Sequence, residues 1–164
     1  MIMVHLECKP DELLVMALGI SRKQITHHSG KSRVYGALQK NSNAIGLVDE
    51  DPDPGSPKYT YENDLMLIEE KFGVKRFADK KRSNTVLVLK IKLEDWLISA
   101  GKVSGIDITK QPYNLPGHGN DLHKVINDRF PVYQKLLDDL LAKNNKPLLT
   151  LKEWLKQKGS NAGD

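Results

Sequence analysis

Four acidic residues lie within five positions in the segment AIGLVDEDPDPG, which covers residues 44–55 and begins as an apolar run. Carboxylates grouped in this way bind a divalent cation when they converge, whereas in an ordinary surface loop they only keep the chain solvated. Asp49 and Asp51 alternate along the chain, so an extended backbone would direct both to one side. Oxygen ligands, without cysteine or histidine at metal-binding spacing, favour Mg²⁺ or Mn²⁺ over zinc.

A further carboxylate, Glu7, ends the first apolar segment of the chain. The apolar runs, Pro10 and Gly19 predict alternating strands and helices at residues 2–8, 10–18, 24–29, 29–41 and 44–49. This β-α-β-α-β order predicts a parallel, Rossmann-like sheet with helices on both faces. In the common strand order 2-1-3, the carboxyl ends of the first and third strands adjoin. Glu7 would then lie beside Asp49 and Asp51.

The second half of the chain is predicted from its periodicity. Residues 61–73 fit either a helix that ends at Gly73 or a strand that leads into residues 74–81, and we favour the helix. A strand is expected at 85–92 and an amphipathic helix at 93–102. Three helical segments follow a loop rich in proline and glycine. We therefore expect one α/β domain, with a core at 1–105, a C-terminal helical appendage at 106–158 and a disordered tail at 159–164.

Four segments, MVHLECKPDE, ITHHSGKSRV, AIGLVDEDPD and NTVLVLKIKLEDWL, together resemble the Toprim fold of topoisomerases, bacterial primases and OLD-type nucleases. They are similar to small stand-alone Toprim-like proteins of bacteria, which are nuclease-like and often linked with defence or mobile elements. The resemblance spans roughly residues 2–100. It implies that Glu7 binds metal or moves a proton, that Asp49 and Asp51 bind metal, and that Asp53 extends the motif. It also suggests Glu94 as a ligand of a second metal.

Basic residues near the expected acidic edge are candidates for binding phosphate. Lys31 and Arg33 open the helix after the second strand, where backbone N–H groups also favour anions. The segment is not a Walker A motif, because Ile25 stands where that motif needs glycine. His28 ends the second strand and is a candidate for contacting substrate or shuttling a proton. An ordinary capped helix with solvated bases is the alternative interpretation.

A second basic run, VKRFADKKRSN, contains Lys80 and Arg82 close to one aromatic residue. It would contact a nucleic-acid backbone without sequence preference, or it is a solvated turn. The formal charge of +4 permits a polyanionic partner without requiring one.

The sequence predicts a cytoplasmic protein without a membrane anchor, because it has one cysteine, no export signal and no apolar stretch of the roughly 20 residues that span a bilayer. The function we expect is a Mg²⁺- or Mn²⁺-dependent nuclease acting on DNA or RNA. The sequence leaves open whether the chain works alone, as a homodimer or with a partner protein. Two alternatives stay open: a non-catalytic interaction protein of a defence or toxin system, and a small-molecule phosphohydrolase.

Overall fold

The computed structural model describes residues 1–51 and 59–156, and the structural statements below refer to these residues. Its strands are β1 (Val4–Leu6), β2 (Ile25–His27), β3 (Ile45–Asp49), β4 (Leu65–Lys71), β5 (Val74–Asp79) and β6 (Asn84–Leu89). Its α-helices are α1 (Lys9–Ala17), α2 (Lys31–Lys40), α3 (Leu93–Val103), α4 (Gly119–Val125), α5 (Phe130–Ala142) and α6 (Lys146–Lys156). Single 3-10 turns cover Arg22–Gln24, Thr60–Asp64 and Ile126–Asp128.

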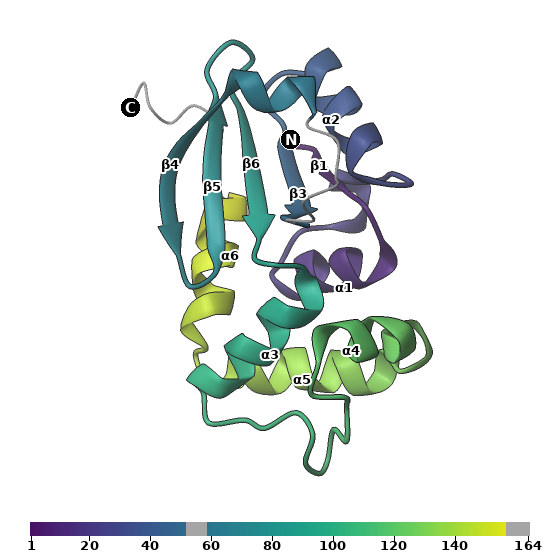
Figure 1. Cartoon of the computed structure of the whole chain (residues 1–164). Coiled ribbons are helices and arrows are strands. Elements are labelled where there is room, and N and C mark those ends of the chain that lie inside the picture. Colours follow the sequence, from purple (N-terminus) through teal and green to yellow (C-terminus); the bar gives the residue numbers. More distant parts are fainter. Residues whose placement is uncertain (52–58, 157–164) are drawn as a thin grey trace.

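The strands form one mixed sheet in the order β2-β1-β3-β6-β5-β4 (Figure 1). The pairs β2–β1, β1–β3 and β3–β6 are parallel, whereas β6–β5 and β5–β4 are antiparallel. The predicted α/β class and the order 2-1-3 at the start of the chain are therefore confirmed. The winding reverses between β1 and β3, which is where open parallel sheets commonly bind ligands.

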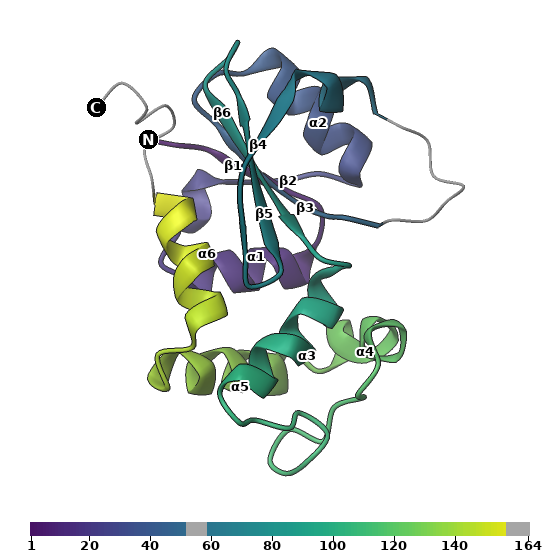
Figure 2. The ribbon, with the colours of Figure 1, turned by 60° about the vertical axis from the view of Figure 1, so that its left-hand side comes forward.

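Alternating apolar side chains give the sheet two covered faces. In β3, Ile45 and Leu47 belong to the larger core, whereas Val48 packs in a smaller core with Val34 and Leu38 of α2. The larger core also contains residues of α1, α3, α5 and α6. Figure 2 shows α2 on one side of the sheet and α1 and α6 on the other. Helices therefore cover both faces, as the sequence predicts.

The expected helix at 61–73 is wrong, because this segment forms a short 3-10 turn followed by β4. Strand β4 ends in a two-residue hairpin turn, with Lys71 opposite Val74 and positive φ angles at Phe72 and Gly73. Positive φ at both turn residues matches the right-handed twist of the paired strands. Gly73 therefore closes a hairpin, although the same glycine also resembles the end of a helix. Strand β4 is exposed at the edge of the sheet, so its sequence lacks the alternation of apolar and polar residues that would have distinguished a strand from a helix.

The C-terminal helices contribute to the larger core. Leu122 of α4, Tyr133 of α5 and Leu151 of α6 are all buried in it. The hydroxyl of Tyr133 donates to the Pro10 carbonyl oxygen at 2.8 Å, which joins α5 to the start of α1. Figure 1 shows α4 and α5 beyond the carboxyl ends of β3 and β6. Helices α4 and α5 therefore border the carboxyl ends of the parallel strands, the edge of the sheet at which a ligand is expected.

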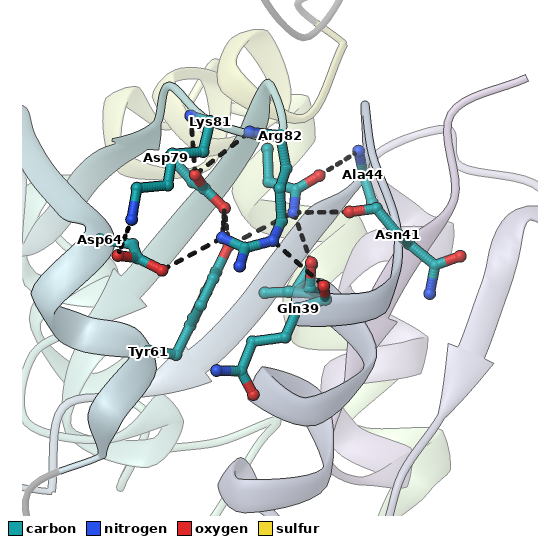
Figure 3. A network of polar contacts seen from close by, with 10 residues as sticks. Gln39, Asn41, Ala44, Tyr61, Asp64, Asp79, Lys81 and Arg82 are labelled. Atoms are coloured by element: carbon teal, nitrogen blue, oxygen red, sulfur yellow. Dashed lines mark hydrogen bonds and ion pairs between the residues drawn. The ribbon is translucent and has the colours of Figure 1, made fainter.

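A buried polar network lies at the opposite edge of the sheet, by the amino ends of β3 and β6 (Figure 3). At its centre is Asp79, whose side chain is inaccessible to solvent and accepts hydrogen bonds from the Tyr61 hydroxyl at 2.8 Å and the Arg82 guanidinium at 3.0 Å. Asn84 extends the network by accepting the Ala44 N–H at 2.9 Å. The network therefore joins the β5–β6 turn to the start of β3.

No helix among residues 1–51 and 59–156 has both the length and the apolar character needed to cross a bilayer.

Candidate metal centre

The carboxyl ends of β1 and β3 bring Glu7 and Asp49 together. These strands are paired in parallel with Leu6 opposite Leu47, so the residues that follow them meet at one edge. Glu7 reaches across this edge, and its Oε1 accepts the backbone N–H of Asp49 at 3.3 Å. This is the juxtaposition that the predicted strand order requires.

The Asp49 side chain points toward the start of α3. Its Oδ1 accepts the backbone N–H of Leu93, the first residue of that helix, at 2.9 Å. Asp49 thus caps the helix that follows β6, on the side of the sheet that carries the larger core. Asp49 therefore lies close to two carboxylates that belong to helices, Asp11 of α1 and Glu94 of α3.

Asp11 and Glu94 are two buried acids at this edge. Each is only 2% exposed, and each lies in the first turn of a helix, α1 for Asp11 and α3 for Glu94. Asp11 Oδ1 and Glu94 Oε1 are buried without a hydrogen-bond partner among the described residues. A buried carboxylate oxygen with no donor is costly, and a cation would relieve that cost.

Sequence reasoning missed Asp11 as a site residue, although it had considered Glu94. Acids in the first turn of a helix suit the helix dipole, and that explanation is sufficient for most of them. The signal that could have identified Asp11 is its position four residues after Glu7, because the helix starts directly at the carboxyl end of β1. A residue of its first turn therefore stays close to the edge.

The carboxylates perturb one another strongly. Burial, followed by the charges of Asp11, Glu7, Asp51 and Glu94, raises the pKa of Asp49 from 3.8 to about 9. Burial is also the main reason that the pKa of Asp11 rises to about 7. Hydrogen bonds from the Cys8 thiol and the Glu7 backbone oppose this rise, and the charges of Glu7 and Glu94 add to it. The pKa of Glu7 is raised by burial and by Asp51, against a lowering contribution from Lys31. Without a cation, part of this cluster must therefore hold protons.

Asp51 borders the cluster from a different direction than the sequence predicts. The backbone leaves the extended conformation there, with a φ of 44° at Asp51, and its N–H donates to the Ile91 carbonyl oxygen at 3.0 Å. Asp51 is exposed, yet its charge still raises the pKa values of Glu7 and Asp49. The intervening Glu50 turns to β5 and pairs with Lys75 at 2.6 Å. Asp53, the remaining predicted ligand, lies outside the described residues.

The side chains around this edge fit an oxygen-ligated divalent cation by their chemistry. Glu7, Asp11, Asp49, Asp51 and Glu94 supply only carboxylate oxygens, as Mg²⁺ and Mn²⁺ prefer. In the described part of the chain, however, no three acidic, histidine or cysteine side chains converge closely enough to hold an ion as they stand. Repulsion between unneutralised carboxylates favours such separation, and binding would require the side chains to close on the ion.

Lys31 is held beside the acidic edge, as predicted. Its ammonium donates to the Glu50 carbonyl oxygen at 3.2 Å and lies 5.8 and 5.7 Å from the ring centres of Tyr35 and Tyr59. The aromatic rings and the carbonyl restrict the position of this charge, which also acts on Glu7. Lys31 is therefore placed to meet an anionic group that approaches the carboxylates.

His28 and Arg33 lie on the same side of the sheet as Lys31, at the end of β2 and the start of α2. His28 Nε2 is 2.9 Å from His5 Nδ1, a hydrogen bond between the two imidazoles. Burial, together with His27 and Arg33, lowers the pKa of His28. Arg33 is exposed at the start of α2. Both residues can contact a substrate that extends past β2.

Lys80 and Arg82 are not near the carboxylates. They belong to the turn between β5 and β6, where Asp79 opposes Asn84. That turn lies at the amino end of β6, whereas Asp49 opposes Leu89 at its carboxyl end. Arg82 is also committed to Asp64 and Asp79, at 3.1 and 3.0 Å. The structure therefore separates the predicted basic contact from the predicted metal ligands.

We expect the protein without bound metal to lose stability as the pH rises toward 9. The raised pKa values of Asp11 and Asp49 mean that the folded protein holds protons which the unfolded chain has released. This stabilisation is complete below their ordinary value of 3.8 and is lost as the pH rises to about 7 for Asp11 and to about 9 for Asp49. Thermal melting across this range checks the trend.

In that experiment, Asp49→Asn should flatten the alkaline part of the dependence, and Mg²⁺ should raise the Tm of the wild type most at high pH. A wild-type Tm that does not fall between these pH values would contradict the proposed proximity of the carboxylates.

Comparisons of the chain with family models, with curated proteins and with solved structures found no match. Functional inference therefore rests on the geometry and chemistry of the acidic edge.

Proposed function

We propose that this protein is a Toprim-like, Mg²⁺- or Mn²⁺-dependent phosphodiesterase that cleaves nucleic acid. The observation that carries the proposal is a pair of buried carboxylate oxygens, one on Asp11 and one on Glu94. Neither has a hydrogen-bond partner among the described residues. Both acids lie at the same edge of the sheet as the contact between Glu7 and Asp49. Strands β1 and β3 place Glu7 and Asp49, and helices α1 and α3 place Asp11 and Glu94, at the point where the winding of the sheet reverses. A fold gains nothing from burying like charges there, whereas a cation-dependent enzyme requires them.

The carboxylates divide into two groups that suit this role. The buried Asp11 and Glu94 and the partly buried Asp49 form an inner group beside the starts of α1 and α3. Glu7 and Asp51 form an outer group toward Lys31. A bound divalent cation would polarise a phosphodiester and make an attacking water more acidic. The inner group and the Asp-x-Asp residues would hold it.

Basic residues and histidines near the carboxylates bind and orient the substrate. The ammonium of Lys31, fixed by Tyr35 and Tyr59, neutralises a phosphate oxygen above the carboxylates. Arg33 and His28 extend this contact along the backbone of the nucleic acid. Glu7, whose pKa is raised, accepts a proton more readily than an ordinary carboxylate. These contacts involve phosphate groups, so we expect cleavage without sequence preference.

Calorimetric titration with Mg²⁺ and Mn²⁺, followed by cleavage assays, tests the proposal. We expect cation binding and metal-dependent cleavage of labelled single-stranded DNA, duplex DNA or RNA, which EDTA abolishes. Bis(p-nitrophenyl) phosphate serves as a small diester, and its hydrolysis without inhibition by DNA would identify a small-molecule phosphohydrolase instead. A protein that binds neither ion, with or without nucleic acid, would overturn the enzymatic proposal.

A non-catalytic interaction protein is the second candidate, and strand β4 is the observation in its favour. Met66, Leu67 and Ile68 are 48%, 50% and 46% exposed on this edge strand. In the part of the chain that the structure describes, no strand pairs with the outer edge of β4. Exposed apolar strand edges are common sites of strand addition. Such a role would survive loss of the metal ligands.

A further inference from the structure

Helix α4, from the C-terminal part of the chain, is fastened to the first turn of α3. Lys92 contacts Asn120 across the two elements. Gly119 lies so close to Asp95 that a Cβ at this glycine would collide with the carboxylate. These contacts flank Glu94, so the position of α4 relative to this acid is well defined.

His123 of α4 faces Glu94 from outside the cluster. Its Nδ1 lies 3.4 Å from Glu94 Oε2, and the His123 side chain is 65% exposed whereas that of Glu94 is 3% exposed. The other oxygen of Glu94, Oε1, is the buried atom without a described partner. The two oxygens of one carboxylate therefore have different surroundings, one beside an imidazole and one directed away from solvent.

We propose that His123 is a positioning residue that holds Glu94 Oε2 and thereby directs Oε1 toward the cation. This inference rests on the proposed function, and it assigns a role in the site to the segment after residue 105. Carboxylate ligands of metals are commonly held by a second hydrogen-bonding group, and loss of that group typically costs about 10- to 100-fold in metal affinity or activity. His123 is the side chain of α4 that meets a member of the carboxylate cluster.

Calorimetry with Mn²⁺ alone, on the full chain, tests the proposal. We expect His123→Ala to weaken Mn²⁺ binding about 10-fold. His123→Asn should recover most of the affinity, because its amide nitrogen occupies the place of Nδ1. His118→Ala is the matched control, since His118 is an exposed histidine just before α4, and its affinity should equal that of the wild type.

A double-variant comparison separates positioning from a general loosening of α4. In a Glu94→Gln background, His123→Ala should produce no further loss of Mn²⁺ affinity, because the group through which it acts is already altered. Equal losses in both backgrounds, or failure of His123→Asn to recover affinity, would overturn the positioning role.

The same titrations distinguish this inference from the proposed function. If the wild type binds Mn²⁺ and His123→Ala binds it equally well, the role of His123 is excluded while the metal centre stands. If the wild type binds no divalent cation, the proposed function fails, and the role of His123 fails with it.

Discussion

Asp49→Asn is expected to abolish cleavage and to weaken binding of Mg²⁺ or Mn²⁺ by more than about 100-fold, which exceeds the usual loss from removing a group that only supports a ligand. The substitution removes the carboxylate around which the other four acids are arranged. It should nevertheless preserve the fold, because an asparagine Oδ1 can still accept the Leu93 N–H that Asp49 now accepts. Calorimetry measures the cation affinity, and thermal melting without metal measures the stability.

Stability gives this variant a second, independent readout. Without metal, Asp49 of the wild type holds a proton near neutral pH, so the neutral asparagine should leave the melting temperature unchanged there. Above about pH 9, where Asp49 ionises among the other carboxylates, the variant should melt at a higher temperature than the wild type. Asp138→Asn, at an exposed aspartate of α5, is the matched control and should change neither property. If Asp49→Asn binds the cation as tightly as the wild type does, any metal site must lie elsewhere in the protein.

The sequence predicted the N-terminal half of the sheet well because its signals are local. Short apolar runs separated by Pro10, Gly19 and charged turns specify the alternation of strands and helices. Short parallel connections then leave few arrangements, and the order β2-β1-β3 brings Glu7 to Asp49. The central contact of the candidate site is therefore a consequence of topology that the sequence can reveal.

Other parts of the candidate site depend on interactions between distant segments. The conformation of Asp51 is coupled to its hydrogen bond with Ile91, which follows β6, and no local pattern encodes that pairing. Asp11 joins the cluster only because α1 and α3 start at the same edge. Lys80 and Arg82 seemed available for substrate until the β5–β6 hairpin placed them at the opposite edge. Basic residues that look alike in the sequence, such as Lys31 and Lys80, therefore lie at opposite ends of the strands in the fold.

The second large expected effect concerns that opposite edge: Asp79→Ala should lower the free energy of unfolding by about 3–5 kcal/mol. The Asp79 carboxylate is fully buried and accepts four hydrogen bonds, from the Tyr61 hydroxyl, the Arg82 guanidinium and the backbone N–H groups of Lys81 and Arg82. Alanine would leave these donors without their acceptor, and Tyr61 is itself buried. Urea denaturation measures the loss.

Two comparisons make this prediction specific. Asp79→Asn keeps an acceptor and should cost less than Asp79→Ala, whereas Asp64→Ala removes the outer acid of the network and should cost least. The length of β6, from Asn84 to Leu89, separates the network from the carboxylates by about 17 Å. Folded Asp79→Asn protein should therefore bind Mn²⁺ as the wild type does, because stability and cation affinity arise at opposite ends of the same strands. Parallel loss of both would instead indicate that the two edges are coupled through β3 and β6.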